Sequence, residues 1–339
     1  EGIHVTAVCD TSPEAVEATR GRFGSGLVAY GTPEKLLADS GVDWVCVGSW
    51  NCCHAEHVVA AFKAGKHVFC EKPLALNVED CLRMRDAWKN SGKLFSLGFT
   101  LRYSPHYVRV QQLVSSGAIG DVISMEFNET LYFNHGGYIH ADWRRKTKLA
   151  GSHLLEKCCH DLDLANWILG SVPVKAASFG GLDFFVPRNS WHRERLGTNA
   201  EGKRAFESWN DPEIAGNIVD PFNDDKDIVD NQVAILQYAS GTRATFHTNC
   251  MSAIPERRLY LCGTEGALRA DVMTGRIELQ RVGFDTSRED HDTGACGSHG
   301  DGDRTLARGL AASMIEGRPP KTGIEDGLRA AFAAFGIDQ

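Results

Sequence analysis

The sequence has no excess of positive charge and no long apolar run. Lys and Arg together number 36 against 44 Asp and Glu, which gives a formal charge of −8. A surface that binds nucleic acid or an anionic membrane is therefore not expected. No stretch approaches the roughly 20 apolar residues that span a bilayer, and the N-terminus shows no charged leader followed by an apolar segment. These absences predict a soluble, cytoplasmic protein without nucleic-acid or membrane partners.

Patterns typical of metal sites and disulfide frameworks are also missing. The 11 cysteines are an odd number and include no C-x-x-C pair. Several of them, such as Cys46 and Cys70, lie in apolar runs typical of buried strands. We therefore predict reduced thiols that serve as small apolar side chains, and no metal site.

The sequence further lacks the Gly-rich turn of a dinucleotide-binding βαβ unit. Such a unit carries G-x-G-x-x-G after its first strand and an acidic ribose ligand about 20 residues later. Asp10 ends an apolar strand as that ligand does, although a strand-terminal Asp is also a common turn residue. Counting back about 20 residues from Asp10 passes the N-terminus. We therefore expect the natural chain to begin roughly 25–30 residues earlier, the size of one βα unit.

The first hundred residues alternate between strand and helix patterns. This rhythm predicts right-handed βαβ units on a parallel sheet. The predicted strands are 4–9, 27–30, 44–48, 67–70 and 94–98, and the predicted helices are 13–23, 33–39, 54–64 and 78–90. Residues 1–100 are thus interpreted as an α/β Rossmann-type parallel sheet domain whose first βα unit is absent from the sequence.

From about residue 120 the rhythm changes to strands separated by short turns. The pattern predicts an α+β domain over residues 101–325, with a large, mostly antiparallel sheet, and a C-terminal helix over 326–339. The uncovered sheet face predicts a homodimer or homotetramer. Residues 186–231 show little periodicity and are either a surface excursion or a lid or subunit arm over the active site. The predicted strands are 122–131, 175–185, 232–238, 242–248, 258–262, 267–272 and 276–282, with helices near 104–116, 152–169 and 303–316.

Three segments carry a family resemblance. They read GSWNCCHAEH from Gly48, AGKHVFCEKPL from Ala64 and GSHLLEKCCHDLD from Gly151. In this order they resemble the glucose–fructose oxidoreductase/inositol dehydrogenase (Gfo/Idh/MocA) family of NAD(P)-dependent oxidoreductases. The likeness extends over nearly the whole chain, and its most specific element is Glu-Lys-Pro after the second segment's strand.

The resemblance implies a set of site residues. The candidate catalytic residues are Lys72, His160 and Glu156. The candidate cofactor-binding residues are Asp10, Ser49, Trp50, Asn51, His54, Glu71 and Lys72. The candidate substrate-binding residues are Lys72, Arg144, His160 and His299. The chain departs from the family pattern in that Trp50 replaces a usual Pro, Glu156 replaces a usual Asp, and Lys157 lies beside it.

The chemistry of these residue types agrees with the implied roles. A lysine ammonium stabilises a developing alkoxide, and a histidine that titrates near neutrality exchanges the hydroxyl proton. Glu156 and His160 are four residues apart, so one helix would direct both into one cleft. Without the resemblance, Lys72 would be interpreted as a surface lysine, His160 as a core histidine and Glu156 as a member of a helix-face salt bridge.

The predicted function is hydride transfer between NAD and a hydroxyl of a sugar, sugar acid or cyclitol. NAD is favoured over NADP because Asp10 would repel a 2′-phosphate and no arginine follows to bind one. Three alternatives stay open: an NAD-dependent glycoside-cleaving enzyme of the same fold, a non-catalytic NAD-binding regulator, and a divergent copy that binds no dinucleotide. His299 and the neighbouring Asp303 offer groups for substrate hydroxyls, although a helix N-cap also explains Asp303.

Overall fold

The parallel strands of the first domain form two small sheets. The structure, a computed structural model, describes residues 2–24, 26–207 and 218–339. In the first sheet, β1 (Ala7–Val8) pairs with β2 (Val28–Ala29), and in the second, β4 (His67–Cys70) lies between β3 (Trp44–Val47) and β5 (Phe95–Leu97). All these pairings are parallel. The expected additional βα unit concerns residues outside this sequence and stays a prediction.

Four helices connect these strands. They are α1 (Pro13–Phe23), α2 (Pro33–Leu37), α3 (His54–Lys63) and α4 (Val78–Ser91). Of these, α1, α2 and α4 have side-chain N-caps. Ser12 accepts a hydrogen bond from the Ala15 N–H, and Asn77 accepts one from the Asp80 N–H, so each cap satisfies an otherwise unpaired backbone donor. Because parallel strands end at the same edge, β3, β4 and β5 deliver the residues that follow them to one edge of their sheet.

The second domain is built on an eight-stranded sheet. Its strand order is β13-β12-β11-β10-β6-β9-β8-β7. Within this sheet, only β6 and β9 pair in parallel among the described strands, and the other neighbours are antiparallel. The predicted fold class is confirmed. The strands are β6 (Val122–Tyr132), β7 (Pro173–Gly181), β8 (Asn231–Tyr238), β9 (Arg243–Ser252), β10 (Arg258–Gly263), β11 (Gly266–Asp271), β12 (Arg276–Arg281) and β13 (Arg288–Asp290).

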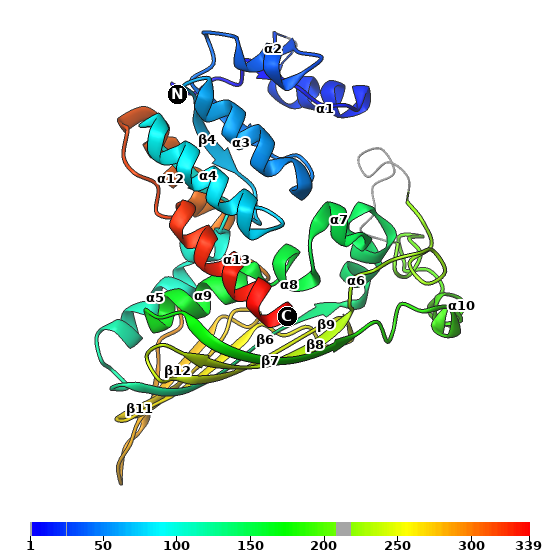
Figure 1. Cartoon of the computed structure of the whole chain (residues 1–339). Coiled ribbons are helices and arrows are strands. Elements are labelled where there is room, and N and C mark those ends of the chain that lie inside the picture. The colour runs from blue at the N-terminus through cyan, green and yellow to red at the C-terminus, as the bar shows by residue number, and fades with distance from the viewer. Residues whose placement is uncertain (1, 25, 208–217) are drawn as a thin grey trace.

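The helices of the second domain gather on one face of this sheet. Figure 1 shows α5 (Pro105–Ser115), α9 (Cys159–Leu169) and α13 (Ile324–Asp338) between the sheet and the first domain, with α12 (Gly302–Glu316) beside them. No described helix covers the opposite face, as the same view shows. Two of its apolar side chains are largely exposed, Phe179 at 80% and Ile235 at 63%. In the described part of the chain, no helix is both long and apolar enough to span a bilayer.

The structure corrects three element predictions. The helix expected over 152–169 is interrupted, since α8 (His153–Glu156) ends before α9 begins at Cys159. The Cys158 N–H reaches the carbonyl oxygen of His153, five residues back, which widens the backbone at this point. The C-terminal helix begins at Ile324 instead of 326.

The third correction is α6 (Phe133–Ala141), a helix that the sequence pattern did not predict. Two consecutive glycines, which favour turns in isolation, lie inside it. A Cβ at Gly136 would lie 1.8 Å from the Cys250 carbonyl oxygen, and one at Gly137 would lie 2.1 Å from that of Phe206. Close backbone approach, which only glycine permits, explains why these two helical positions are glycine.

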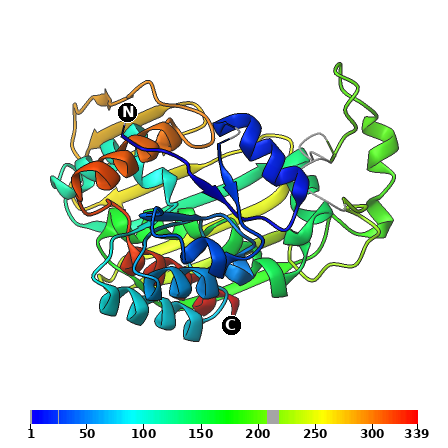
Figure 2. The same cartoon turned by 90° about the horizontal axis from the view of Figure 1, so that it is seen from above.

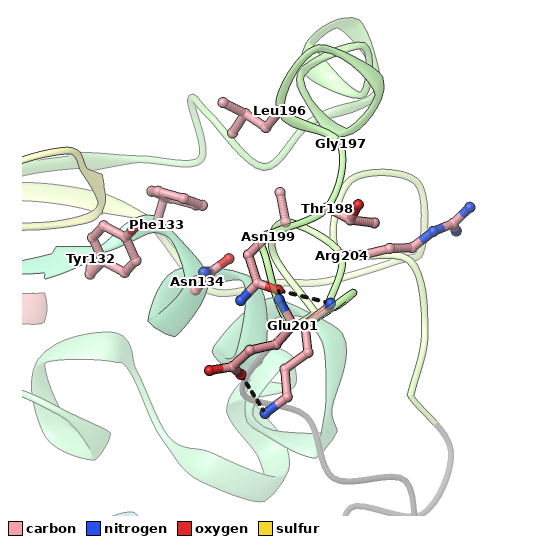
Figure 3. A pocket seen from close by; sticks show the side chains of 11 residues that line it. Tyr132, Phe133, Asn134, Leu196, Gly197, Thr198, Asn199, Glu201 and Arg204 are labelled. Carbon is pink, nitrogen blue, oxygen red and sulfur yellow. Dashed lines mark hydrogen bonds and ion pairs between the residues drawn. The ribbon is translucent and has the colours of Figure 1, made fainter.

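The excursion predicted at 186–231 packs a small core of its own. Phe206 and Phe222 are buried with Phe185 against α6. The excursion contains a 3₁₀ turn (Pro187–Asn189) and α10 (His192–Leu196), which project from the sheet in Figure 1. Residues 208–217 of the predicted excursion lie outside the described residues. A hollow of about 420 Å³ separates Tyr132, Phe133 and Asn134 from Leu196–Ala205 (Figure 3).

Candidate active site

Lys72 of the first domain meets Glu156 of the second. Lys72 follows β4 and Glu156 ends α8, and the Lys72 ammonium lies 3.1 Å from the Glu156 Oε1. The same ammonium also donates to the Glu156 carbonyl oxygen. Two of its three N–H donors are therefore used, and within the described residues the third has no partner and is available to a ligand. The Lys72 side chain is 18% exposed, so this ion pair is largely buried but still accessible to solvent.

Arg144 joins this pair from a 3₁₀ turn (Trp143–Arg145). Its Nε lies 3.3 Å from the Glu156 Oε1, and its Nη1 donates to the Asp142 carboxylate. Its guanidinium also lies 4.8 Å from the Tyr138 ring centroid and 4.4 Å from that of Trp143, within cation–π range. The structure thus places Lys72, Glu156 and Arg144 in one network, although their roles stay predictions.

The network fixes the charges of its members. Burial alone would raise the pKa of Glu156, but Lys72, Arg144 and Lys157 outweigh it and hold that pKa well below its ordinary value. Burial likewise opposes the charge on Lys72, yet the Glu156 carboxylate raises the pKa of Lys72 above its usual range. Glu156 is therefore an anion and Lys72 a cation at neutral pH.

His160 is buried at the start of α9, only 3% exposed. Its Nδ1 has no hydrogen-bond partner among the described residues. Burial lowers its pKa most, and the positive charges of Lys72, Arg257 and Lys157 lower it further. The interruption at Lys157 means that the expected single helix face does not align Glu156 with His160. His160 lies close enough to Lys72 for the ammonium charge to lower its pKa, and it is a neutral imidazole at pH 7.

The carboxyl edge of β3, β4 and β5 carries the candidate cofactor residues. Ser49, Trp50 and Glu71 lie there, and Trp50 is 49% exposed. A Cβ at Gly98, just after β5, would lie 2.7 Å from the Glu71 Oε2, so a larger residue there would require the Glu71 carboxylate to shift. Polar groups at the carboxyl edge of a parallel sheet fit a dinucleotide's nicotinamide half. Asp10 follows β1 in the other small sheet, is exposed, and accepts a hydrogen bond from the Ser12 N–H at 2.8 Å.

Asn51 and His54 hold the backbone around this edge. The Asn51 Nδ2 donates to the Ala150 carbonyl oxygen at 2.8 Å and so links the two domains. The two ring nitrogens of His54 lie 2.8 Å from the Pro73 carbonyl oxygen and 3.0 Å from that of Ser49. His54 is fully buried, so it positions the loops that carry Ser49 and Lys72 instead of offering a nitrogen to a ligand.

His299 lies beside His160, with ring centroids 6.1 Å apart. Its Nδ1 lies 2.8 Å from the Asp303 Oδ2. Asp301, not Asp303, is the N-cap residue of α12, so the side chain of Asp303 is available to His299. The N-cap interpretation of Asp303 was therefore wrong.

A buried cluster beneath the site was missed by the sequence analysis. Arg257 binds both carboxylate oxygens of Asp161, at 2.8 and 2.7 Å, and its Nη2 lies 2.9 Å from Glu129. Glu129, Cys158 and Asp161 have potential metal-ligand atoms within 4.8 Å of one another. The Arg257 guanidinium pairs with both carboxylates. Arg257 directly precedes β10, and the only local signal for its burial is that it alternates with the inward-facing Leu259 and Leu261.

Comparison with known proteins places the chain in a family. A model of the GFO/IDH/MocA oxidoreductase family, NAD-binding Rossmann fold, matches residues 1–99, and a model of its C-terminal alpha/beta domain matches residues 111–333. The chain belongs to the Gfo/Idh/MocA oxidoreductase family. The predicted recognition is confirmed, and NAD is the cofactor of the matching Rossmann domain.

Curated relatives match over part of their length. Inositol 2-dehydrogenase 3 of Saccharopolyspora erythraea is 42% identical over 120 residues, 35% of this chain and 35% of that protein. Inositol 2-dehydrogenase of Salmonella typhimurium is 31% identical over 169 residues, 50% of this chain and 47% of that protein. A 2,7-anhydro-N-acetylneuraminate hydratase of Escherichia coli is 26% identical over 253 residues, 75% of this chain and 58% of that protein. The chain thus spans about half, or less, of the first relatives it matches.

Solved structures share the fold at low identity. Levoglucosan dehydrogenase, in complex with NADH and levoglucosan, superimposes with a TM-score of 0.78 at 18% identity and covers 99% of this chain and 87% of that chain. A putative myo-inositol dehydrogenase from Sinorhizobium meliloti gives a TM-score of 0.69 at 22% identity, with 99% and 88% covered. Both likenesses establish the two-domain fold of the Gfo/Idh/MocA family for this chain.

Proposed function

We propose that the protein is an NAD-dependent dehydrogenase that oxidises a CH–OH group of a sugar, sugar acid or cyclitol. The supporting observation is the Lys72–Glu156–Arg144 network with the neutral imidazole of His160 beside it, at the carboxyl edge of an NAD-binding Rossmann domain. The names of the inositol 2-dehydrogenases that the chain resembles point to the same substrate class.

Bound NAD supplies the hydride acceptor, and the protein residues place the substrate and manage its charge. The free N–H of Lys72 donates to the reacting hydroxyl and stabilises the alkoxide that develops there. Glu156 keeps Lys72 protonated and holds it in place. His160, being neutral, accepts the hydroxyl proton. Ser49, Trp50 and Glu71 line the cofactor edge, with Asp10 on the adenosine ribose, while Arg144 and His299 are the remaining candidate substrate contacts.

Absorbance at the NADH band tests this function. The full-length protein is mixed with NAD and a panel of inositols, aldoses and uronic acids, and we expect NADH to form with at least one member. The Lys72→Met variant should form none, while retaining NAD binding by equilibrium dialysis. Wild-type protein that binds NAD but yields no NADH with any polyol would contradict the proposal.

A second candidate is cleavage or rearrangement of a sugar through transient oxidation. The resemblance to a 2,7-anhydro-N-acetylneuraminate hydratase over 75% of the chain favours it. In that case the hydride returns to the substrate, so product would form without net accumulation of NADH. Chromatographic detection of product in the absence of an absorbance change separates this candidate from a dehydrogenase, and a non-catalytic regulator would give neither signal.

We also propose that the protein is a cytoplasmic homodimer or homotetramer joined through the open sheet face. Phe179 and Ile235 expose apolar surface there, which association would remove from water. Ile235→Lys should therefore lower the mass measured by sedimentation equilibrium, whereas Arg269→Lys should leave it unchanged. A wild-type monomer at micromolar concentration would contradict this proposal.

A further inference from the structure

The protonated, imidazolium form of His160 is unfavourable in its surroundings. Its neighbours Lys72, Arg257 and Lys157 are cations that disfavour an imidazolium, and burial disfavours it still more. A base in these surroundings accepts the hydroxyl proton only if the proton moves on. Turnover under the proposed function therefore requires an acceptor that connects His160 with water.

The position and the tautomer of His299 suit it to accept this proton. Its ring centroid lies 6.1 Å from that of His160, a separation that one water molecule can bridge. The Asp303 carboxylate accepts but does not donate, so the His299 Nδ1, 2.8 Å away, carries the hydrogen. The neutral ring consequently presents Nε2 as a proton acceptor.

The route from His299 leads to solvent. The side chain of His299 is 35% exposed and that of Asp303 is 64% exposed, whereas His160 is buried. Burial lowers the pKa of His299, as do Lys157 and Arg257, while Asp303 opposes this effect. A proton that reaches His299 is thus easily lost to water, which keeps the path open for the next cycle.

The backbone on both sides of His299 is anchored. The Ser298 carbonyl oxygen accepts a hydrogen bond from Arg257 at 3.3 Å, and the Gly300 carbonyl oxygen accepts one from Ser104 at 2.7 Å. Gly300 has a φ of +48°, and a Cβ there would lie 2.5 Å from the Ser104 Oγ. The ring is therefore held at a fixed place beside His160.

We propose that His299, oriented by Asp303, carries the substrate proton from His160 to solvent. The proposal rests on the proposed dehydrogenase function. As the C–H hydride passes to NAD and the alcohol becomes a carbonyl, the O–H proton moves to His160, through a bridging water to the His299 Nε2, and then to bulk water. This assigns His299 a proton-transfer role in place of the substrate contact expected from the sequence.

Chemical rescue tests the proposal on the full-length protein. We expect His299→Ala to lower kcat roughly 10- to 100-fold, the scale of one proton-transfer group, while KM for the polyol changes little. Free imidazole should restore kcat in a saturable manner, and the solvent deuterium isotope effect on kcat should rise. Asp303→Asn should show a smaller loss of the same kind, and Arg304→Gln, an exposed change in the same helical turn, should show none.

Three outcomes would overturn the proposal. They are an unchanged kcat in His299→Ala, a raised KM with unchanged kcat, which indicates a substrate contact, and a lowered kcat that imidazole does not restore. Each is distinct from failure of the proposed function, because that failure is an absence of NADH formation in the wild-type protein itself.

Discussion

Helix α9 and the turn before it carry two kinds of ionic cluster. Away from the site, Arg102 binds both oxygens of Asp163 at 2.7 Å, and these side chains are 8% and 2% exposed. At the site, Lys72 makes a single 3.1 Å contact with the Glu156 carboxylate, and these side chains are 18% and 9% exposed. In the first geometry both carboxylate oxygens of Asp163 are used, and the Arg102 Nη2 also bonds Asp326 at 3.0 Å. In the second, one N–H of the ammonium has no partner among the described residues.

This difference separates ion pairs that hold the fold from the one that can act on a ligand. A bidentate arginine–carboxylate pair is rigid and has little capacity left for a further partner. A lysine ammonium is a compact charge with three donors, so it can be oriented by one anion and still bind a hydroxyl. We expect the Arg102 and Arg257 clusters to govern stability, and the Lys72 cluster to govern activity.

The largest expected effect concerns Lys72. Lys72→Met should reduce kcat/KM by about 10³-fold or more, because the charge that stabilises the alkoxide is lost. Its free energy of unfolding should change little, since Arg144 and Lys157 still neutralise Glu156. Steady-state NADH formation and urea unfolding measure the two quantities. A Lys72→Met variant with a lowered free energy of unfolding but an unchanged kcat/KM would show that Lys72 governs stability and not activity.

The next largest effect concerns Arg257, whose substitution should lower the stability of the protein. Arg257→Met leaves Asp161 as a buried carboxylate without its guanidinium partner and Glu129 with the more distant Lys157, 3.7 Å away. We expect the free energy of unfolding to fall by about 3–5 kcal/mol. Arg269→Met is the matched control, since Arg269 is 60% exposed and 4.0 Å from its partner Glu278, and we expect it to change stability by less than about 0.5 kcal/mol. An equal loss of unfolding free energy in both variants, measured by urea unfolding, would show that buried and exposed ion pairs do not differ in their contribution to stability.

A third effect is a shift in the pH dependence of kcat/KM. His160 must be neutral to accept a proton, and the cation of Lys157 helps to keep its pKa low. Lys157→Gln removes that cation, so the pKa of His160 should rise. As pH falls, kcat/KM should then be lost at a higher pH than in the wild type. A profile that keeps its acidic limb in place would show that His160 does not titrate in catalysis.

The smallest effect concerns the contact between Trp50 and Trp143, which joins the two domains next to Arg144 of the Lys72 cluster. The rings are stacked, with centroids 5.5 Å apart and planes inclined by 18°. Trp50→Ala should cost about 0.5–1.5 kcal/mol, the worth of an aromatic pair, and appear mainly as weaker NAD binding. Isothermal titration with NAD measures it, and Trp191→Ala in the distant excursion is the control. Equal NAD affinity in wild type and Trp50→Ala would exclude Trp50 from the cofactor edge.

The sequence predicted those features that depend on local pattern. The helix predicted over 13–23 matches α1, and the apolar run at His67–Cys70 followed by Glu71-Lys72-Pro73 indicated a strand that delivers Lys72 to the carboxyl edge. Strand alternation after residue 120 likewise predicted the large sheet. These signals lie within a few residues of one another, so they can be recognised in one chain without its partners.

Features that depend on distant contacts could not be predicted in this way. Arg257 meets Asp161 across 96 positions, and no local pattern records such a pairing. The break at Lys157 and the helix around Gly136 depend on packing against other elements, which overrides local propensity. The bond between His299 and Asp303 has helical spacing, yet the same Asp was equally compatible with an N-cap.

A crystal structure of the full-length protein with NAD and a polyol that it oxidises tests the central claim most directly. The account predicts one hydroxyl oxygen within about 3.5 Å of both the Lys72 Nζ and a ring nitrogen of His160, with its carbon facing the nicotinamide. A polyol bound away from Lys72, or apolar side chains packed between Lys72 and His160, would contradict it.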